Sequence, residues 1–195
     1  MVRVIAGTCR GRKLKTLDSD ATKPTLDRVK EAMFSMIFDI IPGAAVFDMF
    51  SGNGSLGIEA LSRGAERCFF CDISGDCCKI IKDNLAALDL TERAKVIKGD
   101  FSEGISAMAR EKVKAGILLL DPPYRKGLVE QALSSKEMRR ICSSGDDDVF
   151  PPGRTVAVCE HAREDELPDK IGGFAKIKTR SYGTVSVTLY EYAGE

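Results

Sequence analysis

The residues with the clearest chemical potential follow the apolar run 117–120, where the sequence reads "DPPY". Pro122 and Pro123 have no backbone N–H to donate, so an extended chain must stop at Asp121. The Asp121 carboxylate and the Pro122 carbonyl would then be two fixed acceptors, and a planar –NH2 group has two hydrogens to offer them. Tyr124 supplies a ring on which a base can stack. The pattern predicts a socket for the exocyclic amine of a nucleobase; the alternative is an ordinary strand-end turn, where Pro and Asp are common.

A glycine-rich stretch, "DMFSGNGSLG", lies upstream of this socket. Gly52, Gly54 and Gly57 spell G-x-G-x-x-G, and Asp72 follows Gly54 by eighteen residues. Glycines of this spacing let the backbone pass close beneath a ligand, and an acid about twenty residues further on can accept both hydroxyls of a ribose. The spacing indicates a cofactor that contains adenosine, and it fits NAD as well as S-adenosylmethionine (SAM).

Two features favour SAM over NAD. Asp48 precedes Gly52 by four residues, near the place where a dinucleotide would put its pyrophosphate. A carboxylate there repels a diphosphate but suits the ammonium and sulfonium groups of SAM. Hydride transfer also has no use for the Asp121 loop, whereas two acceptors that hold an aryl amine free its lone pair for attack on a methyl group. An NAD-dependent reductase or a non-catalytic nucleotide-binding module is the alternative from another class.

Strand and helix alternate along most of the chain. We expect strands at 44–50, 67–73, 94–100, 115–121 and 155–161, and helices at 55–64, 75–88, 102–112 and 126–142. This order predicts a doubly wound, mostly parallel α/β sheet with right-handed crossovers. The tail, 173–192, alternates polar and apolar residues around a Tyr-Gly-Thr turn and predicts an antiparallel hairpin, which gives seven strands. Ligands bind beyond the carboxyl ends of such strands, where Asp100 and Phe101 follow the third strand.

The N-terminal region is basic, although the formal net charge of the chain is zero. Residues 3–17 predict a short hairpin, and a helix is expected from Thr25 to Pro42, so that 1–43 would extend a domain at 44–195. Residues 1–30 hold eight bases and three acids. This asymmetry favours an arm that contacts a polyanion, and a solvated polar face is the alternative.

Composition excludes several classes of protein. Seven cysteines are an odd number, which argues against a disulfide framework. The C-x-x-C at 68–71 falls on an expected strand, where positions three apart point to opposite faces, so we predict no metal. Apolar runs fall short of the ~20 residues of a membrane span, and no secretory signal is evident. We therefore expect a cytoplasmic monomer with no membrane partner.

His161, the only histidine, is expected to be structural, because amine methylation needs no imidazole.

At this point the chain resembles the bacterial methyltransferases that modify the exocyclic N2 amine of one guanine in 16S ribosomal RNA. The similar segments are "RVIAGTCRGRKL", "KPTLDRVKEAMFS", "FDMFSGNGSLGIEALSRGA", "LLDPPY" and "RSYGTVSVTLYEY". The D-P-P-Y motif alone is not specific, because methyltransferases that act on the amines of adenine and cytosine carry relatives of it. An N6-adenine methyltransferase of DNA or RNA is therefore the alternative, although the chain lacks a target-recognition domain for DNA.

The resemblance implies SAM as cofactor and 16S rRNA, within the small subunit or an assembly intermediate, as partner. It implies SAM contacts at Asp48, Gly52, Gly54, Asp72, Asp100 and Phe101, and a flipped base held by Asp121, Pro122 and Tyr124. It also implies RNA contacts from Arg10, Arg12, Lys13, Lys23 and Arg28. The chain departs from the family pattern at Lys23, where Arg is usual, and at Asp72, where Glu is usual. Lysine keeps the charge but loses the bidentate phosphate fork of arginine.

Overall fold

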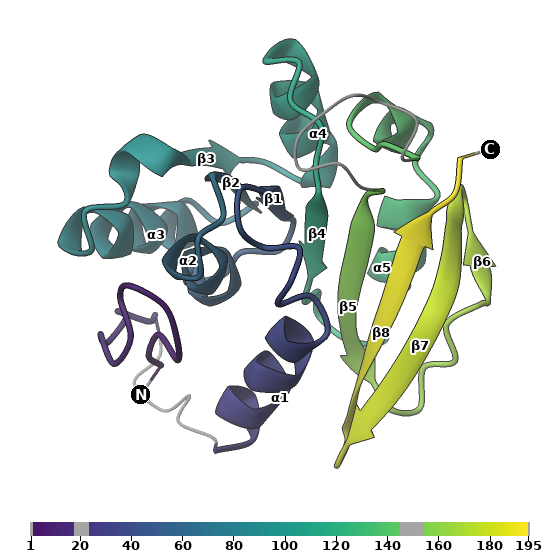
Figure 1. Cartoon of the computed structure of the whole chain (residues 1–195), viewed down its shortest axis with the longest axis horizontal. Helices are drawn as coiled ribbons and strands as arrows, with labels where there is room; N and C mark the ends of the chain where they lie inside the picture. Colours follow the sequence, from purple (N-terminus) through teal and green to yellow (C-terminus); the bar gives the residue numbers. More distant parts are fainter. Residues whose placement is uncertain (1, 18–23, 145–153, 195) are drawn as a thin grey trace.

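The structure, a computed structural model, describes residues 2–17, 24–144 and 154–194. These residues form one eight-stranded sheet in the order β3-β2-β1-β4-β5-β8-β7-β6 (Figure 1). The parallel strands are β1 (Ala45–Asp48), β2 (Arg67–Asp72), β3 (Ala94–Lys98), β4 (Ile117–Leu120) and β5 (Val156–Ala162). The antiparallel strands are β6 (Lys170–Ile171), β7 (Phe174–Tyr182) and β8 (Val185–Tyr192). The predicted mostly parallel sheet with an antiparallel tail is confirmed, and the two-residue β6 adds an eighth strand at the edge.

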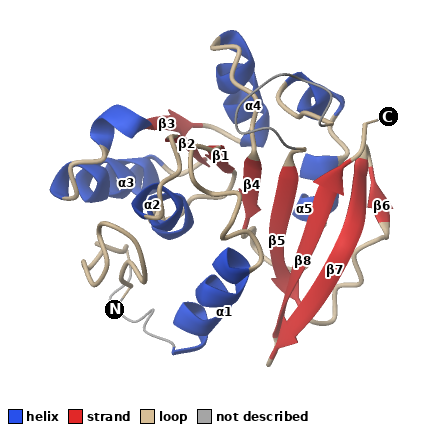
Figure 2. Cartoon of the chain, in the orientation of Figure 1, coloured by secondary structure: helices blue, strands red, loops and turns tan. Residues whose placement is uncertain are grey.

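Helices cover both faces of the sheet (Figure 2). They are α1 (Pro24–Ser35), α2 (Ser55–Ser62), α3 (Gly75–Ala87), α4 (Phe101–Arg110) and α5 (Leu128–Leu133), with 3-10 turns η1 (Thr91–Arg93) and η2 (Lys136–Arg140). Successive strand residues point to opposite faces, so Val46 joins the core under α1, α2 and α3, while Phe47 joins the core under α4 and α5. Because both faces are buried, the central strands are continuous apolar runs rather than alternating ones.

Two predicted helices are shorter than expected. The first ends at Ser35 rather than at Pro42, and the chain continues in turns that are closed by bonds such as Met36 N–H to the Met33 carbonyl. The Ser35 hydroxyl donates to the Ala32 carbonyl at 2.8 Å, which competes with the helical backbone bonds. The apolar stripe survives this change, because Ile37 is still buried.

The helix expected at 126–142 is divided into α5 and η2. The Ser134 hydroxyl donates to the Glu130 carbonyl at 2.6 Å, and Ser135 adopts extended backbone angles. Paired serines thus supply local hydrogen bonds that end the helix.

The predicted N-terminal hairpin is present in a short form. Its antiparallel bridge between Arg3 and Lys13 is flanked by backbone hydrogen bonds from the Val4 N–H to the Arg12 carbonyl and from the Leu14 N–H to the Val2 carbonyl, both at 2.9 Å. Val4 and Leu14 are buried in the same core cluster as α1 and α2. The division of the chain at residue 43 stays a prediction. In the described ranges, no helix is long and apolar enough to cross a membrane, and no three His, Cys, Asp or Glu side chains are grouped as metal ligands would be. All seven cysteines are free thiols.

Candidate active site

The predicted site residues follow strands that end at one edge of the sheet. Asp48 and Asp72 are the last residues of β1 and β2, and Asp121 follows β4 directly. The strand order reverses between β1 and β4, which are paired, so this is the point where the crossovers diverge to opposite faces. The loops after β1 and β4 are therefore neighbours, as the sequence pattern requires.

The glycine-rich loop is tied to the acid at the end of β2. The Gly52 N–H donates to Asp72 Oδ2 at 2.8 Å, and the Ser74 N–H donates to Asp72 Oδ1 at 2.8 Å. Gly54 has a φ of 80° at the start of α2, a left-handed conformation that glycine adopts without strain. A Cβ at Gly57 would lie 2.3 Å from Phe70 Cε1, so glycine is needed there for α2 to pack against β2.

Asp48 is a buried carboxylate with one unused oxygen. Its side chain is 1% exposed, and Oδ2 accepts the Gly57 N–H at 2.9 Å. Oδ1 is buried and has no hydrogen-bond partner within the described residues. Burial is the main cause that raises the pKa of Asp48 to about 7, and the negative charge of Asp72 raises it further. A buried, unpaired carboxylate oxygen fits a cationic ligand better than an anionic one.

The residues after β3 have a clear local role. Asp100 caps α4, because its Oδ1 accepts the Ser102 N–H at 2.7 Å while Glu103 reaches back to the Asp100 N–H at 2.8 Å. The pKa of Asp100 is lowered, mainly because its carboxylate accepts a hydrogen bond from the Ser102 side chain. Phe101 is half-buried, and its ring centre lies 6.3 Å from that of Phe50. Cofactor contacts at these two residues stay predictions.

Sequence reasoning missed Ile73, which follows Asp72 and is 75% exposed. A single exposed apolar side chain is ordinary at a protein surface, but this one adjoins the acid predicted to hold a ribose. Its position directly after the strand-end acid is the signal that could have identified it.

The D-P-P-Y loop presents its acid at the surface of the site. Asp121 is partly exposed, Pro122 is buried and Tyr124 is 40% exposed. No described residue donates a hydrogen bond to the Asp121 carboxylate. Its pKa is raised mainly by burial, and the negative charges of Glu160 and Asp48 raise it further. The acid is therefore free to accept hydrogen bonds from a ligand.

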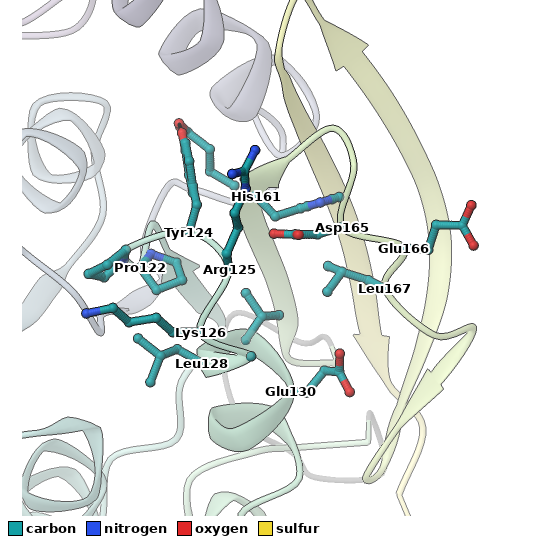
Figure 3. A pocket seen from close by; sticks show the side chains of 14 residues that line it. Pro122, Tyr124, Arg125, Lys126, Leu128, Glu130, His161, Asp165, Glu166 and Leu167 are labelled. Carbon is teal, nitrogen blue, oxygen red and sulfur yellow. Dashed lines mark hydrogen bonds between the residues drawn. The ribbon is translucent and has the colours of Figure 1, made fainter.

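Glu160, near the end of β5, was not predicted. The Tyr124 hydroxyl donates to Glu160 Oε1 at 2.5 Å, and the glutamate is 5% exposed. Figure 3 shows the adjoining cavity of about 380 Å³, with Pro122 and Tyr124 on one side and His161 on the other; Glu160 also lines it. Glu160 lies two residues before the end of β5, so no strand-end position marks it in the sequence as one marks Asp48 and Asp72.

Both ring nitrogens of His161 are engaged in hydrogen bonds, which agrees with the structural role predicted for it. Its Nδ1 lies 2.9 Å from the Ala162 carbonyl, which can only accept, so Nδ1 carries the proton. Nε2 then accepts from the Thr188 hydroxyl at 2.8 Å. Burial lowers the pKa of His161, which favours this neutral form.

The basic N-terminal arm, residues 2–17, is held against α2 by a buried carboxylate that the sequence did not reveal. Glu59 is 0% exposed and accepts the N–H groups of Ile5 at 2.8 Å and Ala6 at 2.9 Å. Its carboxylate also pairs with Arg63 at 2.8 Å and with Lys30 at 3.3 Å. In Figure 1 the arm, in dark purple, lies beside α2 and α3.

The cations predicted to contact RNA differ in whether their side chains already have protein partners. Arg10, Lys13 and Arg28 are exposed, and none of their side chains has a hydrogen bond or ion pair to another described residue. Arg12 is exposed but donates to the Ala87 carbonyl at the end of α3, at 2.7 Å. Lys23 lies outside the described residues. Three of the five cations are thus available to an external anion.

Comparisons with known proteins agree over nearly the whole chain. A family profile described as "Conserved hypothetical protein 95" matches residues 2–191. "Ribosomal RNA small subunit methyltransferase D" of Haemophilus influenzae is 37% identical over 190 residues, 97% of this chain and 93% of the relative. "Putative rRNA methyltransferase YlbH" of Bacillus subtilis is 36% identical over 193 residues, 99% and 100% of the two chains. The solved structure "Putative methyltransferase yhhF from Escherichia coli" is 28% identical with a TM-score of 0.78, over 100% and 99% of the two chains.

Proposed function

The chain belongs to the conserved hypothetical protein 95 family, and from this premise we propose that it transfers a methyl group from SAM to the N2 amine of a guanine in 16S ribosomal RNA. Relatives named as rRNA methyltransferases support the class of substrate. The single observation that carries the chemistry is the placement of Asp121 directly after β4, the strand paired with β1, so that this acid lies beside the glycine-rich loop without a hydrogen-bonding partner for its carboxylate among the described residues.

The residues at the β1 and β2 ends fit SAM. When bound, SAM supplies a methyl carbon made electrophilic by a sulfonium, so no metal is needed. Gly52 and Gly54 would pass beneath the cofactor, Asp72 would accept its ribose hydroxyls, and the exposed Ile73 would cover one face of its adenine. The unused Asp48 oxygen would face its positive charge. Pyrophosphate of a dinucleotide would meet the same carboxylate unfavourably.

The chain's own residues would prepare the amine. Asp121 and the Pro122 carbonyl would accept its two hydrogens, and Tyr124 would stack on the base ring. Holding both hydrogens moves nitrogen toward a pyramidal shape, which releases its lone pair for attack on the methyl carbon as the carbon–sulfur bond breaks. Nitrogen then loses one proton, and the carboxylate of Asp121 is the nearest group proposed to accept it.

Replacing Asp48 with asparagine is expected to raise the dissociation constant for SAM by about 10- to 100-fold, because a charged partner of a buried site is lost. Asparagine keeps an acceptor for the Gly57 N–H, so the loop should stay in place. Isothermal titration of SAM measures the effect. S-adenosylhomocysteine, which lacks the sulfonium charge, should lose less affinity, and equal SAM affinity in the two proteins would contradict this role.

Removing the free cations of the arm is expected to weaken RNA binding and flatten its salt dependence. With Arg10 and Lys13 both changed to alanine, the slope of log K against log salt concentration should fall by about 1.5, for two lost phosphate contacts. Binding to rRNA across a salt series measures this slope. The matched control replaces two exposed lysines elsewhere, Lys112 and Lys136. A slope that is the same as in the control would exclude the arm from the RNA interface.

The target base is tested directly with labelled SAM. Immature small subunits and genomic DNA are each incubated with the enzyme, and the labelled nucleoside is identified after digestion. We expect N2-methylguanosine from the subunits and no label in DNA. Label in N6-methyladenine would instead support the alternative that the D-P-P-Y loop also permits. A second digestion of the labelled rRNA to oligonucleotides, followed by mass spectrometry, locates the methylated nucleotide.

A further inference from the structure

Glu160 is a buried side chain whose carboxylate has one oxygen without a hydrogen-bond partner among the described residues. It is 5% exposed, yet no cation pairs with it in the described ranges, and its one hydrogen bond there comes from the Tyr124 hydroxyl to Oε1. No described residue donates a hydrogen bond to the second oxygen, Oε2, which is not fully buried, and Glu160 lines the cavity beside the D-P-P-Y loop. A carboxylate oxygen that borders a cavity and has no protein donor is free to accept a hydrogen bond from a ligand or water.

The position of Glu160 relative to Asp121 is set by the sheet. Leu120 of β4 is the register partner of Cys159 in β5, so the next residues, Asp121 and Glu160, follow on adjacent strands about 5 Å apart. Their electrostatic coupling agrees with this proximity, because the charge of Glu160 raises the pKa of Asp121. Two acceptors that belong to different strands thus lie side by side at the same edge.

We propose that Glu160 selects guanine: its free oxygen accepts the ring N1–H of the base whose N2 amine is held by Asp121. This inference rests on the proposed function. Guanine alone among the amine-bearing bases has an N–H donor next to the amine, whereas in adenine and cytosine the neighbouring ring nitrogen is an acceptor. A carboxylate at that place attracts the first and repels the others. Acceptors that would otherwise stay unpaired are a strong basis for such selection.

The contact with Tyr124 gives Glu160 a second role. The hydroxyl bond fixes the carboxylate and the stacking ring relative to one another, so the base is located by its face and its edge at once. A carboxylate on N1–H also pushes electron density into the ring and toward N2, which makes the amine a better nucleophile. Glu160 is therefore a specificity-determining residue that also positions Tyr124.

The test compares guanine with 2-aminopurine, which keeps the 2-amine but has an acceptor at N1. Small subunits are reconstituted around rRNA that carries either base at the nucleotide located above. We expect the wild-type enzyme to prefer guanine in kcat/KM by about 30-fold or more, and Glu160→Gln to narrow this preference to about 3-fold or less, because the glutamine amide can donate to N1. Glutamine still accepts from Tyr124, and SAM affinity should stay unchanged.

The outcomes separate the two proposals. If wild-type enzyme fails to methylate the guanine subunits, the proposed function is wrong and this inference falls with it. Methylation of guanine with the same preference in Glu160→Gln as in wild type would overturn the inference alone. Should Glu160→Gln fail to fold, Tyr124→Phe provides the second variant, since it removes the hydroxyl that fixes Glu160 and keeps the ring. In Tyr124→Phe, the logarithm of the guanine preference in kcat/KM should fall to about half of its wild-type value. An unchanged preference would count against the proposal.

Discussion

Asp121→Asn is expected to lower kcat for methyl transfer by a factor of about 10³ while SAM affinity changes by less than about threefold. Asparagine has the same size but presents a neutral acceptor and a competing donor to the substrate amine, so the group that grips the amine and takes its proton is lost. Asp121 lies beyond β4 and no described residue donates a hydrogen bond to it, so its loss should leave the glycine-rich loop intact. Single-turnover transfer from labelled SAM gives the rate, and titration gives the affinity.

The control for this variant is Asp39→Asn, an exposed aspartate in the turns after α1. It should behave as wild type in both measurements. A parallel loss of rate and SAM affinity in Asp121→Asn would place the acid in the cofactor site rather than in the base socket.

The same residue determines the pH dependence. The carboxylate is the active form, and burial together with the charges of Glu160 and Asp48 raises the pKa of Asp121 above the ordinary range of aspartate. Activity should therefore be present above that raised pKa and should fall as the pH drops through it, well before an ordinary aspartate would be protonated. Bound SAM is positive and moves this acid limb back toward lower pH.

Most of the sheet could be predicted because strand ends are marked by local chemistry. Pro122 fixes the end of β4 and the glycines after Asp48 fix the end of β1, and alternation with helices then requires parallel order. Helix ends were harder, because Ser35 and Ser134 act through side-chain bonds to preceding carbonyls that no apolar period reveals. The two-residue β6 has too few residues for any pattern.

Two of the missed residues, Glu160 and Glu59, were missed for the same reason. Glu160 matters because β5 lies next to β4, and Glu59 matters because the arm folds across α2. Both facts are tertiary, so the sequence alone presents two ordinary acids within apolar segments. Asp48, Asp72 and Asp121 could be predicted from the sequence. Glycines or prolines follow Asp48 and Asp121 within a few residues, and Asp72 follows Gly54 at the spacing typical of a ribose-binding acid.

Glu59→Ala is expected to lower the free energy of unfolding by about 3–5 kcal/mol, since it leaves the buried Lys30 and the partly buried Arg63 without their partner. Lys30 would keep its bonds to the Arg3 carbonyl at 2.6 Å and Ser55 at 3.1 Å but lose its counter-charge, and burial already lowers its pKa. Arg63 would lose its partner at 2.8 Å. Urea unfolding measures the change, and Glu31→Ala, an exposed acid of α1, is the matched control that should differ by less than about 0.5 kcal/mol.

If RNA binding requires the arm to be docked on α2, a substitution that undocks the arm without removing a charge should weaken RNA binding. Gly7 has a φ of 83°, and a Cβ there would lie 1.8 Å from the Ser62 carbonyl oxygen, so Gly7→Ala must displace the arm. Gly11 has a φ of 81° but no atom within 4 Å of its Cβ, so Gly11→Ala carries the same backbone strain without the clash. Loss of rRNA binding in Gly7→Ala alone, with SAM affinity retained, would separate docking from strain. Equal rRNA binding in the two variants would mean that RNA binding does not depend on the docking of the arm against α2.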